Sequence, residues 1–284
     1  MIQKILLAGS GTGNSVEMLK NLLALPALQG SSVTVLHVIP QKTSDREMGA
    51  KSEEGEKIMT ETVQTLNLRE DKISTKLLQG DPKTEVCKVA DEINADLIVM
   101  GSRGLNRLRA ILQNSVSQYV FQLTNRPMLL VKDDIYVKKL RRVAIALDKT
   151  DAAKYCLDLA LYLLRDYSDA ELILVRVNPD LDPKLLPLSK EETENNPTIA
   201  EALPKVKRSG VNYRCVVTAG RPGEELCKVA EEYNIDLLIL GSPDRRPSIA
   251  KSLPDLDRLL GTSLSDYVRV NATCPILLAR QESA

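Results

Sequence analysis

A polar segment rich in glycine and arginine follows an apolar run in the first half of the chain. It reads GSRGLNRLRAILQNSVSQYV and spans residues 101–120. Gly101 and Gly104 would let backbone N–H groups approach phosphate oxygens, and three arginines could pair with those oxygens (Arg103, Arg107 and Arg109). A helix expected to begin near Asn114 and Ser115 would add free N–H donors and the positive end of its dipole. The segment is therefore a candidate phosphate-binding loop.

A second glycine-rich segment, GSGTGNS at residues 9–15, follows the first apolar run of the chain. Its spacing differs from the dinucleotide-binding fingerprint, because Gly13 stands two residues after Gly11 where that motif requires three. The chain also lacks a GxxxxGK[ST] motif. The glycines of both segments could bind phosphate or could simply form tight turns between strands and helices, and the pattern alone leaves both interpretations open.

Histidine and cysteine give little support for catalysis or metal binding. His37 is the only histidine, and its place in the run VLHVI predicts a packed strand residue. Cys87 and Cys227 fall on the apolar stripes of two equivalent predicted helices, which predicts buried small hydrophobic residues. No group of residues has metal-ligand spacing, so we predict neither a catalytic residue nor a metal site.

The elements that must position the two glycine-rich segments alternate between apolar runs and amphipathic stretches. Strands are expected at residues 5–9, 32–39, 73–80, 96–101 and 127–131. Helices are expected between them, at residues 14–25, 52–68, 82–94 and 115–124. This β-α-β-α-β-α-β-α-β order predicts an α/β, Rossmann-like fold with a doubly wound, five-stranded parallel sheet. Such sheets bind ligands beyond the carboxyl ends of their strands, where both glycine-rich segments are expected to lie.

The same pattern occurs twice along the chain. GDPKTEVCKVADEINADLIVMGS at residues 80–102 matches GRPGEELCKVAEEYNIDLLILGS at residues 220–242 without a gap. The two stretches are offset by 140 residues. Repeats in solenoid proteins have periods of only about 20 to 50 residues, so this offset indicates a duplicated domain. We predict two tandem domains of the same fold, at residues 1–135 and 139–284. In the second copy, SKEETENNPT at residues 189–198 predicts a solvated, mobile loop.

Composition narrows the partners and the compartment. The 284 residues include 38 Lys+Arg and 38 Asp+Glu, so the predicted main partners include neither nucleic acid nor an anionic membrane. No stretch reaches the roughly 20 apolar residues that a bilayer span needs, and the first residues lack the features of a signal peptide. The five cysteines form no CxxC pair. Together these features predict a cytoplasmic protein.

The combination resembles the universal stress protein family in its tandem two-domain form. The family signature is G-x-x-G, nine residues, then G-[ST]; the first copy has Gly101, Gly104, nine residues and then Asn114 and Ser115. The stretches ADLIVMGSRG and SVSQYV…RPMLLVK are also typical of the family. The resemblance extends over nearly the whole chain, once in each of the two copies. It implies an adenine nucleotide alpha hydrolase-like fold in each copy and, as in the nucleotide-binding members, bound ATP, ADP or AMP, with any Mg arriving on the nucleotide.

The resemblance implies a set of nucleotide contacts in the first copy. These are Ala8, Gly9, Ser10, Val38, Met100, Gly101, Ser102, Gly104, Asn114, Ser115, Val116 and Ser117. Two of them depart from the family pattern, because Asn114 stands where the family has Gly and Ser10 where its ATP-binding members have Asp.

The second copy departs differently. Asp148 occupies the family's Asp position, but Asp244 replaces the second glycine in a longer loop with three prolines. A carboxylate beside a triphosphate is repelled unless a cation bridges them. We therefore predict that ATP is bound mainly by the first copy. The second possible site, with a degenerate phosphate loop, comprises Asp148, Gly241, Ser263 and Ser265.

The resemblance predicts an adenine-nucleotide-binding regulator of the stress response, with no catalytic residue assigned. Two alternatives stay open: a scaffold that binds no nucleotide, and a weak ATP hydrolase on the same fold. The final strands of the two copies, in RPMLLVK and CPILLAR, are predicted to be edge strands. In the family this edge pairs protomers. An intramolecular pseudo-dimer is therefore expected here, and a homodimer is left open.

Overall fold

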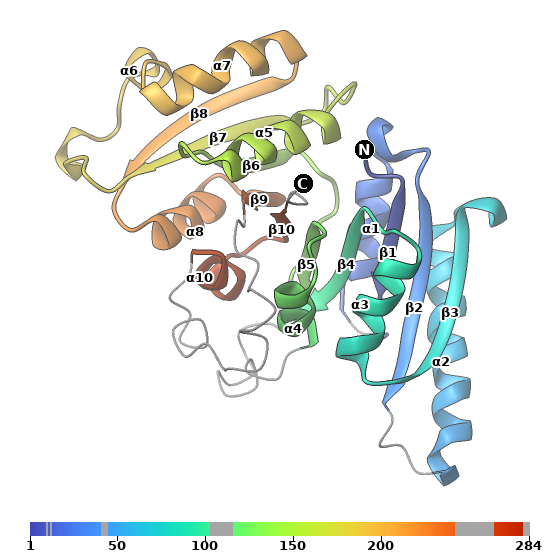
Figure 1. Cartoon of the computed structure of the whole chain (residues 1–284). Helices are drawn as coiled ribbons and strands as arrows, with labels where there is room; N and C mark the ends of the chain where they lie inside the picture. Colours follow the sequence, from blue (N-terminus) through green and yellow to red (C-terminus); the bar gives the residue numbers. More distant parts are fainter. Residues whose placement is uncertain (10, 12, 41–44, 103–115, 242–263, 281–284) are drawn as a thin grey trace. The chain divides into compact units, whose positions relative to one another are not determined.

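The computed structural model describes residues 1–9, 11, 13–40, 45–102, 116–241 and 264–280. The chain divides into two compact units, the first made of residues 1–24 and 28–138 and the second of residues 25–27 and 139–284. Strands and helices alternate in each unit (Figure 1).

The first unit contains five strands and four helices among its described residues. In chain order they are β1 (Lys4–Ala8), α1 (Ser15–Leu23), β2 (Ser32–Pro40), α2 (Asp45–Leu66), β3 (Ile73–Gly80), α3 (Pro82–Glu92), β4 (Leu97–Ser102), α4 (Val116–Leu123) and β5 (Met128–Lys132).

The strands of the first unit are parallel and lie in the order β3-β2-β1-β4-β5. The chain runs outward from β1 to β2 and β3, and then crosses to the other side of β1 to form β4 and β5. β1 and β4 are therefore the neighbouring strands from which the connections leave in opposite directions, and Ala8 pairs with Met100 at their carboxyl ends. Doubly wound sheets bind ligands at this switch point.

Helices cover the sheet of the first unit in two pairs. α1 packs against α2, and α3 packs against α4. Ile5, Leu6 and Leu7 of β1 are fully buried, as expected for a parallel strand with helices on both faces. α3 begins where the sequence signals predict, with Pro82 in its first turn and the Asp81 carboxylate accepting a hydrogen bond from the backbone N–H of Lys83 at 3.2 Å.

Where it is described, the second unit repeats this plan with one additional short helix. Its elements are β6 (Arg142–Ala146), α5 (Asp151–Leu163), β7 (Glu171–Asn178), α6 (Lys190–Glu194), α7 (Pro197–Ser209), β8 (Asn212–Ala219), α8 (Pro222–Glu232), β9 (Leu237–Gly241), α10 (Leu264–Asn271) and β10 (Ile276–Ala279). Its parallel strands lie in the order β10-β9-β6-β7-β8, so the switch point falls between β6 and β9. Two doubly wound sheets of five parallel strands confirm the fold class predicted from the sequence.

Two local predictions were wrong. α2 begins at Asp45, well before the predicted start at residue 52. The predicted loop at residues 189–198 instead contains α6 and the start of α7. Ser189 Oγ accepts a hydrogen bond from the backbone N–H of Glu192 at 3.2 Å, and the Glu192 carboxylate accepts one from the backbone N–H of Ser189 at 2.8 Å. This reciprocal capping box stabilises a helix in a segment whose composition suggests a loop.

Within the described ranges, no helix is both long enough and apolar enough to span a membrane.

Candidate functional site

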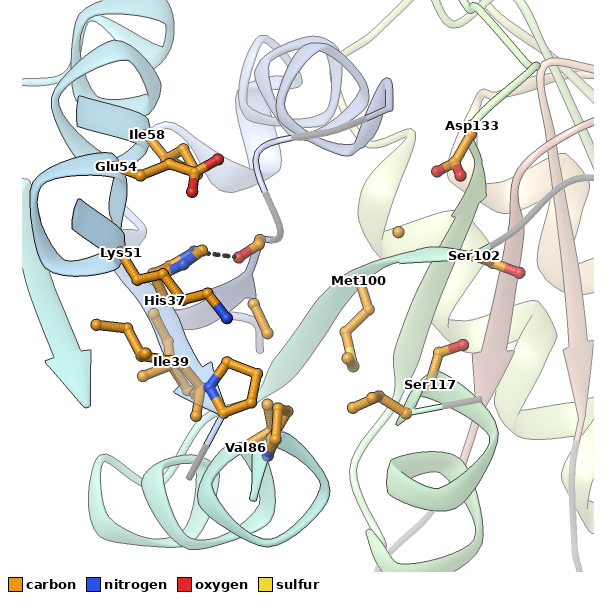
Figure 2. A pocket seen from close by; sticks show the side chains of 18 residues that line it. His37, Ile39, Lys51, Glu54, Ile58, Val86, Met100, Ser102, Ser117 and Asp133 are labelled. Atoms are coloured by element: carbon orange, nitrogen blue, oxygen red, sulfur yellow. Dashed lines mark hydrogen bonds between the residues drawn. The ribbon is translucent and has the colours of Figure 1, made fainter. Parts of the chain in front are cut away.

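A cavity of about 500 Å³ opens at the carboxyl ends of β1, β2 and β4 in the first unit (Figure 2). Apolar side chains from the strands and from α3 form one part of its lining, with Leu36, Ile39, Val86 and Met100 among them. Polar and charged side chains form the rest: His37, Lys51, Glu54, Ser102, Ser117 and Asp133. An apolar wall with a few convergent polar groups is typical of a small-molecule site.

The structure brings eight of the predicted nucleotide contacts to this cavity. They are Ala8, Gly9, Val38, Met100, Gly101, Ser102, Val116 and Ser117. The other four, Ser10, Gly104, Asn114 and Ser115, lie outside the described residues, as do Arg103, Arg107 and Arg109. The eight residues come from four different elements and the turn after β1, so the switch-point topology is what gathers them.

The glycine-rich turn after β1 has two positions that require glycine. Gly11 has φ +76° and Gly13 has φ +83°, in the left-handed region that residues with a Cβ rarely adopt. A Cβ on Gly11 would stand 2.6 Å from Cδ1 of Ile58 in α2, and one on Gly13 would stand 2.5 Å from Oδ1 of Asp133. Both glycines therefore serve the tight turn and its close packing, which was one of the two interpretations left open by the sequence.

Two asparagine side chains hold the segment that follows β5: Asn14, the N-cap residue of α1, and Asn21 within α1. Nδ2 of Asn14 donates to the carbonyl oxygens of Asp133 at 3.2 Å and Ile135 at 2.8 Å. About two turns further along α1, Nδ2 of Asn21 donates to the carbonyl oxygen of Val137 at 2.5 Å. We call residues 133–137 the exit segment, because they lead out of the first unit. Asp133 belongs both to this segment and to the cavity wall.

His37 lies in β2, as predicted, but it also lines the cavity, which the sequence did not reveal. Its Nδ1 lies 3.0 Å from the carbonyl oxygen of Gly9. A carbonyl oxygen can only accept a hydrogen bond, so Nδ1 must carry a proton in this arrangement. The hydrogen bond ties the imidazole to the turn after β1 and fixes its orientation beside the cavity.

α2 supplies three cavity residues that the sequence analysis missed. Lys51, Glu54 and Ile58 lie three and four residues apart, which places them on one face of the helix. Figure 2 shows them entering from α2, with Met100 in the middle and Ser102 and Ser117 on the other side. We call these three residues the α2 stripe. The helical spacing was visible in the sequence, but nothing there indicated which face of α2 meets the ligand edge of the sheet.

The corresponding edge of the second unit is packed differently. The Asp148 carboxylate accepts hydrogen bonds from the backbone N–H and the hydroxyl of Thr150, so it is engaged at the start of α5. A Cβ on Gly241, at the end of β9, would stand 2.8 Å from Cβ and 2.9 Å from the carbonyl carbon of Ala152. The first turn of α5 therefore lies directly against the end of β9. Ser265 lies in α10, and Ser263 falls outside the described residues.

The cysteines differ in burial. Cys87 and Cys227 are only partly buried, so the prediction that both are buried was wrong. The buried face of α3 consists of Val86, Val89 and Ala90. Cys87 is the next residue after Val86, so its side chain points to one side of this face and is only partly covered. Cys156 in α5 is buried, and desolvation, together with the nearby Asp148 carboxylate, raises the pKa of its thiol to about 12. The described residues contain no group of histidine, cysteine or acidic side chains arranged to hold a metal ion.

The fold and the cavity define an α/β protein of the doubly wound class, with a ligand-type pocket at the switch point of its first sheet. The model of the universal stress protein family matches the chain twice, at residues 1–132 and 139–280. This chain therefore belongs to the universal stress protein family and carries two copies of its domain.

The lengths over which relatives match agree with this duplication, because a whole relative can match less than half of this chain. The universal stress protein YxiE of Bacillus subtilis is 28% identical over 148 residues, which is 46% of this chain and 100% of that protein. A universal stress protein of Methanothermobacter thermautotrophicus is 33% identical over 122 residues, covering 39% of this chain and 77% of that protein. The crystal structure of a universal stress protein from Archaeoglobus fulgidus matches with a TM-score of 0.72 and 22% identity, over 98% of this chain and 96% of that one, and shares its fold.

Proposed function

We propose that the first unit binds an adenine nucleotide in the cavity at its switch point and that the protein acts as a nucleotide-responsive regulator of the stress response. The observation that carries this proposal is the convergence of Ala8, Gly9, Val38, Met100, Gly101, Ser102, Val116 and Ser117 on one cavity. The family pattern marks these positions from the sequence alone. Their convergence supports the assignment because positions that share no ligand would be expected at separate places in the fold and not around one cavity.

The size and lining of the cavity fit such a ligand. Its volume of about 500 Å³ lies within the roughly 300–1,000 Å³ of small-molecule pockets. The apolar part, with Ile39, Val86 and Met100, suits the flat base. Ser102 and Ser117 suit the phosphates, because Ser117 lies in the first turn of α4, where free N–H groups and the helix dipole favour negative charge. Any Mg would be carried by the phosphates.

We further propose one nucleotide per chain. In the second unit, Asp148 is engaged by Thr150, and Gly241 lies against Ala152, so two of the family's ligand positions are already in use. The sequence adds Asp244 to that loop, a carboxylate that would repel phosphate.

Isothermal titration of ATP, ADP and AMP into the purified protein tests the proposal. We expect saturable binding with a stoichiometry of one per chain. Gly104→Asp introduces the carboxylate that the second copy carries at its equivalent position and should weaken ATP binding by at least tenfold, the effect of about 1.4 kcal/mol. Gly30→Asp is the matched control, because Gly30 lies just before β2, at the amino-terminal edge of the sheet, with open space for a Cβ.

The outcomes separate the alternatives. Absent binding, or equal binding to both variants, would contradict the site assignment, and two nucleotides per chain would contradict the inactive second site. Release of phosphate from ATP, lost on substituting Ser117, would favour the hydrolase. Mass spectrometry of small molecules released from freshly purified protein gives an independent result, since co-purified ATP, ADP or AMP supports binding. Assembly through β5 and β10 stays a prediction, which light scattering can check.

A further inference from the structure

Two successive residues of β2 hold Gly9, the first residue of the turn after β1. Ala8 and Leu36 form the last pair of the β1–β2 ladder, and the backbone N–H of Gly9 donates to the carbonyl oxygen of Leu36 at 3.1 Å. The next contact comes from a side chain, because Nδ1 of His37 donates to the carbonyl oxygen of Gly9 at 3.0 Å (Figure 2). The strand pairing therefore fixes one side of Gly9, and the imidazole of His37 fixes the other.

Gly9 is a glycine for a different reason from Gly11 and Gly13. Its φ lies outside the left-handed region, and a Cβ built on it would meet no described atom within 4 Å. Neither the turn geometry nor packing within the described residues therefore requires glycine at this position. Gly9 lines the cavity, and a residue without a Cβ lets a ligand approach the backbone closely. The absence of a side chain at Gly9 therefore favours contact between the ligand and its backbone.

The imidazole of His37 is itself held by α2 and β3. A Cβ on Gly55 would stand 3.0 Å from Cδ2 and 3.6 Å from Nε2 of His37, so this edge of the ring lies against the backbone of α2. The same Cβ would stand 2.9 Å from Cδ1 of Leu77, the β3 residue paired with His37. Ile58 of the α2 stripe lies over the turn after β1, because a Cβ on Gly11 would stand 2.6 Å from its Cδ1. These contacts leave the ring little room to rotate out of its hydrogen bond.

We propose that His37 is a positioning residue of the nucleotide site: its Nδ1–H holds the carbonyl group of Gly9 so that the backbone of the turn stays open to the ligand. This inference rests on the proposed nucleotide site and adds a residue that the family signature does not contain. Because a side chain makes the contact, its loss should weaken nucleotide binding while the pairing of β1 with β2 remains.

Isothermal titration of ATP into His37→Leu and His37→Asn tests this role. Leucine fills the space of the ring but donates no hydrogen bond. The shorter asparagine carries an amide N–H donor near the position of Nδ1 and leaves part of the ring volume empty. We expect ATP to bind about three- to tenfold more weakly to His37→Leu, the range for one hydrogen bond, and within about twofold of the wild type to His37→Asn. A packing role predicts the opposite order, because asparagine leaves the larger gap.

Ser31→Ala is the matched control. Ser31 Oγ donates to the carbonyl oxygen of Ile2 at 2.9 Å, so this variant also removes a side-chain hydrogen bond to a backbone carbonyl of the first unit. Ser31 lies just before β2, at the opposite edge of the sheet from the cavity, so the affinity for ATP should be unchanged. Hydrogen exchange in peptides of the first unit measures whether each variant stays folded.

Gly9→Ala tests the approach of the ligand to the turn. The new Cβ meets no described atom within 4 Å, so the first unit should keep its stability. ATP should nevertheless bind at least tenfold more weakly, because the methyl group stands where the ligand approaches the backbone.

Nitrogen-15 NMR of the imidazole tests the hydrogen bond without any substitution. His37 is the only histidine of the chain, so the signals of its two ring nitrogens need no further assignment. We expect a proton on Nδ1 both in the free protein and in the ATP complex.

Four results would overturn the inference. An Nδ1 without a proton would show that the hydrogen bond to Gly9 is absent. Wild-type affinity for ATP in His37→Leu would show that the bond is not used, and a loss in His37→Asn as large as in His37→Leu would assign His37 a packing role. Wild-type affinity in Gly9→Ala would show that the ligand does not approach this turn. The failure of the proposed function looks different, because then the wild type would bind no ATP although Nδ1 carries its proton.

Discussion

Replacing Gly13 by alanine should destabilise the first unit by more than backbone preference alone can explain. Gly13 has φ +83°, and the left-handed region costs an alanine about 1–2 kcal/mol. The smaller entropy of the unfolded alanine chain returns about 0.4–1 kcal/mol, so the conformational balance is about 1 kcal/mol. A Cβ would also stand 2.5 Å from Oδ1 and 3.3 Å from Cα of Asp133. Rotating the Asp133 side chain relieves the first contact but not the second, for which the Asp133 backbone must give by a few tenths of an ångström, and we expect a total loss of about 2–3 kcal/mol.

Two other glycines separate these contributions. Gly210, which caps the end of α7, has φ +71°, and a Cβ there would meet nothing within 4 Å. Gly210→Ala therefore measures the conformational cost alone, about 1 kcal/mol. Gly30 has open space and no left-handed φ, so Gly30→Ala should be neutral or slightly stabilising.

Hydrogen exchange at increasing urea concentration measures the unfolding free energy of each unit separately, from peptides that lie within it. The chain contains no tryptophan, so exchange is also more informative here than fluorescence. We expect the loss in the first unit for Gly13→Ala to exceed the loss in the second unit for Gly210→Ala by about 1–2 kcal/mol. If the two losses are equal, the close contact with Asp133 has no energetic consequence and the packing argument is refuted.

Three further predictions concern other parts of the chain. Asn21→Ala removes one partly buried hydrogen bond and should cost the first unit about 1 kcal/mol, with faster hydrogen exchange in the exit segment; unchanged exchange there would contradict the role of Asn21. The pKa of Cys156 is raised by burial, so between about pH 9 and pH 11 the unfolded chain loses this proton and the folded one keeps it. Stability should therefore fall as the pH rises, and in urea titrations across this range Cys156→Ala should remove up to about 1.4 kcal/mol per pH unit of that slope; an identical slope would argue against the buried thiol. Ser189→Ala breaks the capping box with Glu192, so trypsin should cleave after Lys190 sooner than in the wild type, unless α6 persists without its cap.

The fold could be predicted from the sequence because most of its strands and helices have clear local sequence signals. The strands of a doubly wound sheet are continuous apolar runs, such as DLIVMG before the candidate phosphate-binding segment, and Pro82 marks the start of α3. The duplication then repeats the alternation of strands and helices in the second copy. The switch point follows from the alternation of elements alone, which is why positions chosen for their motif meet at one cavity.

The α2 side of the site could not be predicted in the same way. Lys51 and Glu54 belong to a long, charged helix, and a solvent-exposed face and a ligand-facing face look alike in such a sequence. Their place at the cavity depends on how closely α2 approaches the sheet. The absence of a side chain at Gly55 permits this close approach, because a Cβ there would stand 3.0 Å from Cδ2 of His37. Gly55 and His37 are not neighbours in the sequence, so a local pattern does not reveal the contact. By contrast, the capping box of Ser189 and Glu192 was readable as an S-x-x-E pattern and was outweighed by the polar composition around it.

The hydrogen bonds from Asn14 and Asn21 also determine where the first domain can be severed for separate expression. A polypeptide stopped after β5, at Lys132, would lose the three carbonyl groups that these amides bind, and one stopped at residue 135 would still lose the carbonyl of Val137. Asn21 would then be left with an amide group facing a gap, and the side chain of Val137, only 8% exposed, would no longer cover its neighbours. The shortest version expected to keep the turn, the cavity and α1 in register therefore extends through Lys138. Libraries of truncated or fused variants should place their junctions beyond that residue.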